Sequence, residues 1–107
     1  MTEREFNRII GRNIKFFRER CFTNQISKIT KRIISKPLTQ KQLGRKIDVS
    51  FQQVQKYEHG KNKISVYKLL KFCKFFQVPF KYFIDEQTHS KVPYARNLHN
   101  AEQQHNI

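Results

Sequence analysis

Apolar residues recur along the first 21 positions of the chain with the spacing of a helix. Five of them follow one another at steps of four, four, three and four, and so share one helical face: Phe6, Ile10, Ile14, Phe17 and Cys21. Arginine and lysine residues lie on another face. The pattern predicts a helix over about residues 3–20, with its apolar face in the core.

A second apolar face follows Ser65, which is placed to cap a helix. The residues predicted to face the core are Leu69, Leu70, Phe72, Cys73 and Phe76. Pro79 ends this helix, because proline cannot continue its hydrogen bonding. Residues 80–84 then suit one or two further turns, with Tyr82 or Phe83 closing the bottom of the core.

Residues 21–37 are predicted to form a short basic amphipathic helix. Ile26, Ile29 and Ile33 recur at steps of three and four. The basic residues between and after them are Lys28, Lys31, Arg32 and Lys36. Pro37 prevents the helix from continuing.

Two helix starts stand eleven residues apart in the middle of the chain. Thr39 with Gln42, and Ser50 with Gln53, each fit a capping box, in which each side chain bonds the backbone amide of the other residue. Residues 48–50 separate the two short helices. Their predicted inner faces hold Leu43, Ile47, Val54 and Tyr57. Two short helices joined by a three-residue turn form a helix-turn-helix.

Length limits the number of domains, and the charge of the chain indicates what kind of partner it binds. The 107 residues leave room for one small domain. They hold 22 lysines and arginines against 8 acids, a net charge of +14. All of the excess lies in residues 1–85, since residues 86–107 hold two basic and two acidic residues. We therefore expect a domain over 1–85, a polar, mobile tail over 86–107, and a polyanionic partner, with nucleic acid favoured over an anionic membrane.

Several classes of function find no support in the sequence. No apolar run reaches the length of about 18 residues that crosses a bilayer, and the start has no signal-peptide segment. Cys21 and Cys73 are expected to be buried thiols, as in a reducing, cytoplasmic compartment. The sequence has no nucleophile pairing, glycine-rich phosphate loop, carboxylate pair or metal-ligand spacing, so we expect no enzyme, metal or cofactor.

The outer side of the second short helix carries amide and basic side chains. On a helical wheel, the side opposite the core holds Gln52, Gln55, Lys56 and His59, with Phe51 at its edge. An amide pairs with adenine, a lysine donates to guanine, and an aromatic ring lies against a thymine methyl group. This side is typical of a helix that reads the major groove.

The middle of the chain resembles a known family. The stretch LTQKQLGRKIDVSFQQVQKYEHGKNKIS, followed by YKLLKFCKFFQVPFKYF, is similar to the DNA-binding domain of the Xre family of phage-repressor and Cro-like proteins, and more narrowly to bacterial members. With the segment from Ile10 to Arg18, the resemblance covers about residues 9–84. It implies an all-α, five-helix domain that binds pseudo-palindromic duplex DNA as a homodimer.

The resemblance also implies roles for individual residues. Phe51, Gln52 and Lys56 match base-contacting positions, with Ser50 and Gln55 beside them. Phosphate-contacting positions are matched by Arg18, Gln40, Lys61, Asn62 and Lys63. Arg18 is also expected to form an ion pair with Glu58.

Two departures from the family pattern remain to be interpreted. The basic segment 21–37 is inserted between the first and second helices. It is a basic arm that contacts DNA outside the half-site, a surface for a partner, or a tolerated excursion of the surface. Gly44 stands where alanine is commoner, which favours a close helix crossing at this small residue.

Together these patterns predict a sequence-specific, duplex-DNA-binding transcriptional regulator that occupies its operator as a dimer, with no enzymatic step. An antitoxin or a restriction-modification controller is the alternative with the same fold. A basic RNA-binding or protein-interaction module is the alternative from another class. No small-molecule effector and no dimer interface are indicated.

Overall fold

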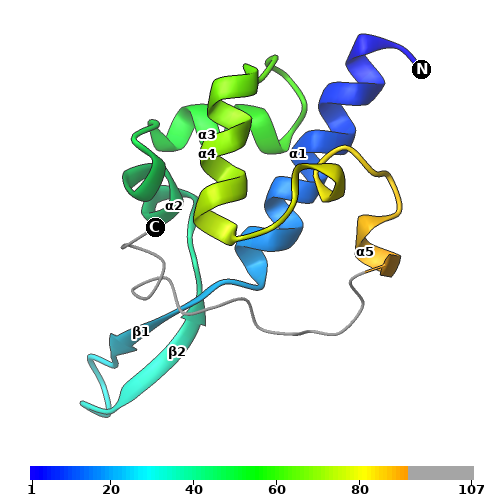
Figure 1. Ribbon diagram of the computed structural model, residues 1–107. Coiled ribbons are helices and arrows are strands. Elements are labelled where there is room, and N and C mark those ends of the chain that lie inside the picture. Colours follow the sequence, from blue (N-terminus) through cyan, green and yellow to red (C-terminus); the bar gives the residue numbers. More distant parts are fainter. Residues whose placement is uncertain (92–107) are drawn as a thin grey trace.

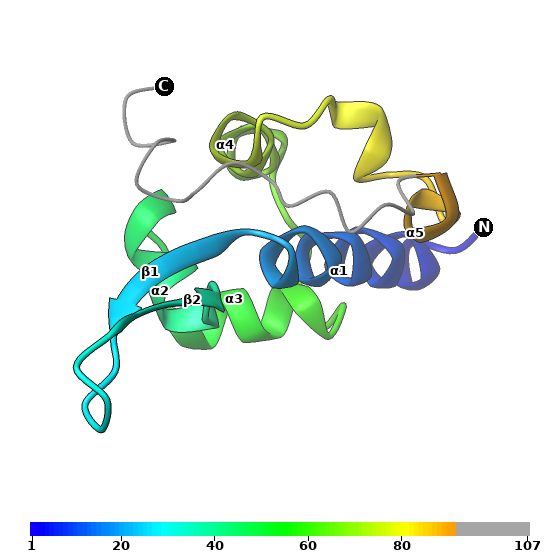
Figure 2. The same cartoon turned by 90° about the horizontal axis from the view of Figure 1, so that it is seen from below.

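The computed structural model describes residues 1–91, and residues 92–107 of the predicted tail lie outside the described residues. The elements run in the order α1 (Glu3–Glu19), β1 (Phe22–Ile26), β2 (Ile33–Pro37), α2 (Gln40–Ile47), α3 (Phe51–Glu58), α4 (Val66–Phe76), the 3-10 turn η1 (Phe80–Tyr82) and α5 (Thr88–Lys91). The described part is mostly helical, with one two-stranded antiparallel sheet (Figure 1). In Figure 2, α4 lies on one side of the molecule and α3 on the other.

Four helices begin where the sequence provides a capping side chain. The hydroxyls of Thr2, Ser50 and Ser65 each accept a hydrogen bond from the backbone amide three residues later, at 3.1 Å. Thr39 and Gln42 form the complete capping box, with bonds of 3.1 and 2.9 Å. These bonds satisfy amides that have no partner within the helix, and so fix the starts of α1 to α4.

The predicted helix-turn-helix is present in α2 and α3. The turn begins at Asp48, whose φ of 59° lies in the left-handed region and ends α2. Gly44 is buried beneath this turn, because a Cβ atom there would lie 2.4 Å from the Val49 carbonyl oxygen. A close approach is therefore present at Gly44, but the approaching group is the turn of the same motif and not the crossing helix that the sequence predicted.

Phenylalanine fills the centre of the core. The ring centroid of Phe17 in α1 lies 6.1 Å from that of Phe76 in α4 and 5.0 Å from that of Phe83. All three side chains are buried. Cys21 and Cys73 are buried in the same cluster, and burial raises the pKa of the Cys73 thiol. Both thiols thus take the place of small apolar groups.

Two residues predicted to face the core, Phe6 and Leu70, are exposed instead. Leu70 follows the buried Leu69, and neighbouring residues on a helix point about 100° apart, so only one of them faces inward. Phe6, in the first turn of α1, is also exposed. The helical period was correct, but it overestimated the width of the buried face.

Residues 22–37 form a β-hairpin, so the amphipathic helix predicted there is wrong. β1 and β2 pair antiparallel, with Ile26 opposite Ile33, and Lys31 in the connecting loop has a φ of 61°. Isoleucine, being β-branched, favours a strand. Three apolar positions in so short a run fit one helical face and also fit two strands joined by a turn.

The end of the described chain packs against α1. Asn13, buried in α1, donates from Nδ2 to two carbonyl oxygens just after η1, at 2.8 and 2.9 Å. Thr88 is buried and its hydroxyl donates to a carbonyl oxygen of η1. The further turn predicted over 80–84 is the single 3-10 turn η1, and residues 86–91, assigned to the tail by the sequence, include α5.

Gly11 marks the close approach of α1 to α3 and offers a test of the fold. A Cβ atom at Gly11 would lie 2.0 Å from the Tyr57 carbonyl oxygen, so the backbone would have to move. We predict that Gly11→Ala lowers the free energy of unfolding by about 1–3 kcal/mol, although alanine is the better helix former. Urea unfolding measures the loss, and Lys15→Ala at an exposed position of α1 is the control. Unchanged stability of Gly11→Ala would contradict this crossing.

Candidate nucleic-acid interface

One side of α3 is buried and the other is open to solvent. Val54, Tyr57 and Glu58 are buried, and the Tyr57 ring meets Phe72 of α4 edge-on, with centroids 6.2 Å apart. The exposed residues of α3 and its caps are Ser50, Phe51, Gln52, Gln55, Lys56 and His59. The helix is thus held by its apolar side and presents amide, aromatic and basic groups outward.

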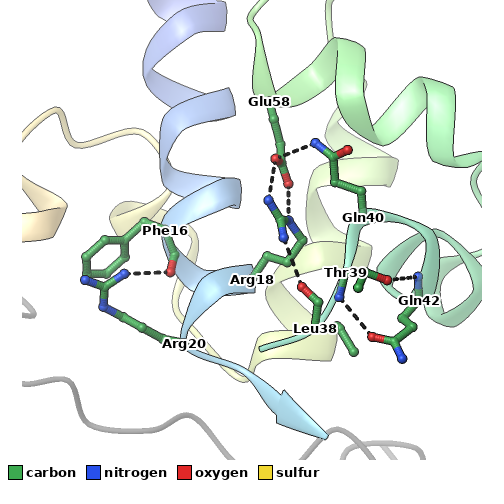
Figure 3. Close-up of polar contacts among 8 residues, drawn as sticks. All are labelled: Phe16, Arg18, Arg20, Leu38, Thr39, Gln40, Gln42 and Glu58. Carbon is green, nitrogen blue, oxygen red and sulfur yellow. Dashed lines mark hydrogen bonds and ion pairs between the residues drawn. The ribbon is translucent and has the colours of Figure 1, made fainter. Parts of the chain in front are cut away.

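A polar cluster fixes the end of α3 to two other helices (Figure 3). Arg18 donates from Nε to Glu58 Oε2 at 2.6 Å and from Nη2 to Oε1 at 3.0 Å. Gln40 Nε2 donates to Glu58 Oε1 at 2.9 Å. We call Glu58, Arg18 and Gln40 the Glu58 clamp. It joins the end of α1, the start of α2 and the end of α3.

The Glu58 clamp holds a carboxylate that is almost completely removed from solvent. The side chain of Glu58 is 1% exposed and that of Arg18 is 12% exposed. A buried charge is tolerated when it is paired and hydrogen-bonded, and both conditions are met here. Arg18 Nη1 also donates to the Leu38 carbonyl oxygen at 2.9 Å. Three of its five N–H groups are therefore used within the protein, which leaves two for any ligand.

A shallow hollow lies beside the clamp, at the start of α2. Its lining comes from three helices and their caps, and its polar and charged members besides Arg18 are Lys15, Glu19, Thr39, Gln40, Glu58 and His59. The first amides of a helix have no partner within it and carry the positive end of its dipole, so a helix start favours an anion. Lys15 was not among the predicted site residues. Its sequence signal is its place on the basic face of α1, three residues before Arg18.

A second hollow lies between the end of α3 and the start of α1. Its basic lining residues are Arg4, Arg8, His59 and Lys61. The predicted loop residues Lys61, Asn62 and Lys63 are all exposed. Lys63 pairs with Glu3 at 3.3 Å on the surface, an arrangement worth little in free energy. Arg4 and Arg8 were also missed by the sequence prediction, because only the packing of α1 on α3 brings them to this loop.

None of the helices in residues 1–91 is long and apolar enough to cross a membrane. Within the same residues, histidine, cysteine, aspartate and glutamate do not gather in a group of three or more that suits a metal ion. The polar groups around α3 are amide, hydroxyl and basic side chains, together with the carboxylates of Glu3, Glu19 and Glu58.

Comparison with known proteins places the chain in a family. The sequence pattern that defines a helix-turn-helix family matches residues 25–83, which is more than half of the chain. The chain belongs to the Xre-type helix-turn-helix family. No solved structure is significantly similar to it.

Three curated relatives align over 49 residues each, which is 46% of this chain. An uncharacterized transcriptional regulator in the ATPase CF(0) region of Rhodospirillum rubrum is 49% identical over 45% of its length. Uncharacterized HTH-type transcriptional regulators of Sinorhizobium medicae and Rhizobium meliloti are each 33% identical over 35% of their length. The aligned segment thus spans less than half of each relative.

The Glu58 clamp is tested by removing its carboxylate. We predict that Glu58→Ala destabilises the helix-turn-helix domain by about 3 kcal/mol, because breaking a buried ion pair leaves the other charge without a partner. Gln40→Ala removes one hydrogen bond to the carboxylate and should lower the free energy of unfolding by about 1 kcal/mol. Urea unfolding of both variants measures the difference. Equal, small losses would show that the position of α3 does not depend on the clamp.

Proposed function

We propose that this helix-turn-helix protein is a sequence-specific, duplex-DNA-binding transcriptional regulator that places α3 in the major groove. The observation that carries the proposal is the exposed side of α3, which presents two glutamines and a lysine. The only acid of this helix, Glu58, is turned inward. Family membership, the names of the relatives and the net charge of +14 support the same function.

In the proposed complex, side chains of α3 read base edges. Gln52 and Gln55 both donate to and accept from adenine, and Lys56 donates to guanine. The half-exposed ring of Phe51 lies against a thymine methyl group. Ser50 Oγ already accepts the Gln53 amide, and its O–H remains able to donate to DNA.

Phosphate contacts are proposed on both sides of α3. At the start of α2, the first amides and Gln40 hold one phosphate, with the remaining N–H groups of Arg18 behind it. At the other end, the loop residues contact the opposite backbone: Lys61, Asn62 and Lys63. The hollows described above add Lys15 and Arg8 to this set. These contacts position the protein without reading sequence.

We also propose that two copies bind together as a homodimer. A helix-turn-helix dimer reads two half-sites about 34–36 Å apart, which is one turn of the duplex. A pseudo-palindromic operator would mirror the symmetry of such a dimer. This proposal is supported by the family resemblance, and the spacing of half-sites tests it directly.

Selection of binding sites from random duplexes at about 150 mM salt tests specificity and spacing together. We predict an inverted repeat with one helical turn between half-site centres. If six to ten phosphates are contacted, affinity should fall about 10³- to 10⁵-fold between 50 and 200 mM salt. Titration by fluorescence anisotropy measures this slope. A flat response to salt would rule out DNA as the main ligand.

Two substitutions separate base reading from phosphate contact. Gln52→Ala should relax the preference at one position of each half-site and weaken specific binding by about 1–3 kcal/mol. Lys61→Ala should weaken binding to all duplexes alike. Both variants are titrated with a duplex that holds the selected site and with a random duplex, and their losses of affinity are compared. The assignment would be refuted by equal losses on both duplexes for both variants.

Other observations discriminate the alternative functions. A basic RNA-binding module would prefer structured RNA to a duplex of equal charge in competition, and a DNA-binding regulator would not. An antitoxin or a restriction-modification controller would also bind DNA. It would be recognised by a toxin bound to the protein or by a restriction system encoded beside it.

A further inference from the structure

The hairpin formed by β1 and β2 is not required by the helix-turn-helix. We call residues 22–37 the hairpin arm. Its base is anchored at the buried Leu38. The backbone amide of Leu38 donates to the Cys21 carbonyl oxygen at 2.7 Å, and the carbonyl oxygen of Leu38 accepts from Arg18 Nη1 at 2.9 Å. Beyond this base the two strands contact each other far more than they contact the helices. Figure 1 shows the arm projecting away from the helical body.

The outer half of the hairpin arm is both apolar and basic. Ile26, Ile29 and Ile33 expose 69%, 93% and 72% of their surface. The exposed basic residues of the arm are Lys28, Lys31, Arg32 and Lys36. The sequence has no acid between Glu19 and Asp48. Since the isoleucines are not packed in the described fold, they are available to a partner, and the partner has to tolerate four positive charges.

The loop of the arm points to the side of the molecule on which α3 lies. In Figure 2 the loop extends past α3 and away from α4. A duplex that accepts α3 in its major groove would lie on this same side. Once α3 is bound, the arm would meet that duplex at a high effective concentration, because the protein already holds the two together.

Charge decides between DNA and a second copy of the chain as the occupant. Two arms packed on each other would bring together four cations from each copy, and like charges oppose such contact. A DNA duplex presents one phosphate about every 1.7 Å along its axis. A two-stranded ribbon fits into a groove, and isoleucine is among the side chains that enter the minor groove as apolar wedges.

We propose that the hairpin arm is a second DNA-contacting element, which binds the duplex outside the half-site read by α3. Its four basic residues contact phosphates, and Ile29 at the tip contacts sugar or base edges in the neighbouring groove. The inference rests on the proposed function of α3 and adds to it a contact with flanking DNA of any sequence. The backbone at Lys31 supports this role, since its φ of 61° favours glycine and a lysine there is strained.

Binding to two duplexes tests the proposal. The short duplex ends with the selected half-sites, and the long duplex adds about one helical turn, or ten base pairs, on each side. We expect the wild-type protein to bind the long duplex more tightly. With a slope of about 0.9 per phosphate, two to four contacts are worth roughly 30- to 1,000-fold at 0.15 M salt.

The variant K28Q/K31Q/R32Q/K36Q should bind both duplexes with equal affinity, and its salt slope on the long duplex should fall by about two to four. The matched control, K68Q/K71Q/K74Q/K81Q, loses the same charge from η1 and from α4, the helix that lies across the molecule from α3 in Figure 2, and should keep the preference for the long duplex. This control separates the position of the charges from the net charge.

Two single substitutions separate folding from binding. Lys31→Gly relieves the left-handed backbone while removing one cation, so it should keep or raise stability and still weaken binding to the long duplex about fivefold. Ile29→Ala should weaken that binding without changing the salt slope, because it carries no charge. If the fourfold variant does not fold, an Asn-Gly turn in place of residues 25–34 keeps the buried base and gives the same comparison.

The outcomes distinguish this inference from the function on which it rests. If the wild-type protein binds neither duplex, the proposed function of α3 fails. If it binds the short duplex and neither the flanks nor the arm variants change the affinity, the arm proposal is overturned and the function of α3 stands. Sedimentation that shows a dimer lost in the arm variants, with no effect of flanks, would assign the arm to a second copy and also overturn the proposal.

Discussion

The position of α3 depends on a carboxylate that has been taken out of water. Glu58 is satisfied by a guanidinium from the end of α1 and an amide from the start of α2. A shift of any of the three helices would leave a buried charge without its partners, which is costly in free energy. Gly11 adds a steric limit at the same crossing, since the Tyr57 carbonyl oxygen occupies the place of its missing side chain. The helix proposed to read DNA is therefore fixed before any ligand binds.

Turning Glu58 inward also shapes the electrostatics of the surface. It leaves the outer side of α3 without an acid, and the preceding stretch from Arg20 to Ile47 contains none. Such an excess of like charge opposes compaction, and the phenylalanine cluster around Phe17 provides the opposing apolar burial. A polyanion that neutralises this surface would stabilise the fold, because a ligand that binds only the folded state shifts the equilibrium toward it.

The parts of the fold that the sequence could predict are those with strong local signals. The long apolar faces of α1 and α4 and the capping residues of α2 and α3 each act within a few residues of one another. The hairpin was not predictable in this way, because three isoleucines in so short a run fit a helix as well as two paired strands. The bond that closes its base joins Leu38 to Cys21, which are 17 positions apart. α5 was missed for a related reason, since its one buried residue, Thr88, has no apolar pattern around it.

The candidate site also contains residues that local sequence patterns predicted and residues that only long-range packing brings into place. The residues on the outer side of α3 could be predicted from a helical wheel, because Val54 and Tyr57 mark its inner side. The residues opposite them are exposed in the structure. Lys15, Arg4 and Arg8 were not predicted, since their place beside α3 depends on the crossing of two helices at Gly11. A long-range contact of this kind has no counterpart in the spacing of residues along one helix.

Arg18 links the two elements that the proposals assign to DNA. Its Nε and Nη2 hold the end of α3 through Glu58, and its Nη1 holds the base of the hairpin arm through the Leu38 carbonyl oxygen. One planar guanidinium therefore sets the position of the reading helix relative to the arm. In the proposed complex, a duplex that receives α3 would meet the arm at a fixed distance along its axis. Because lysine has neither the planar fork nor enough donors in that geometry, it could not replace arginine at this position without loosening one of the two connections.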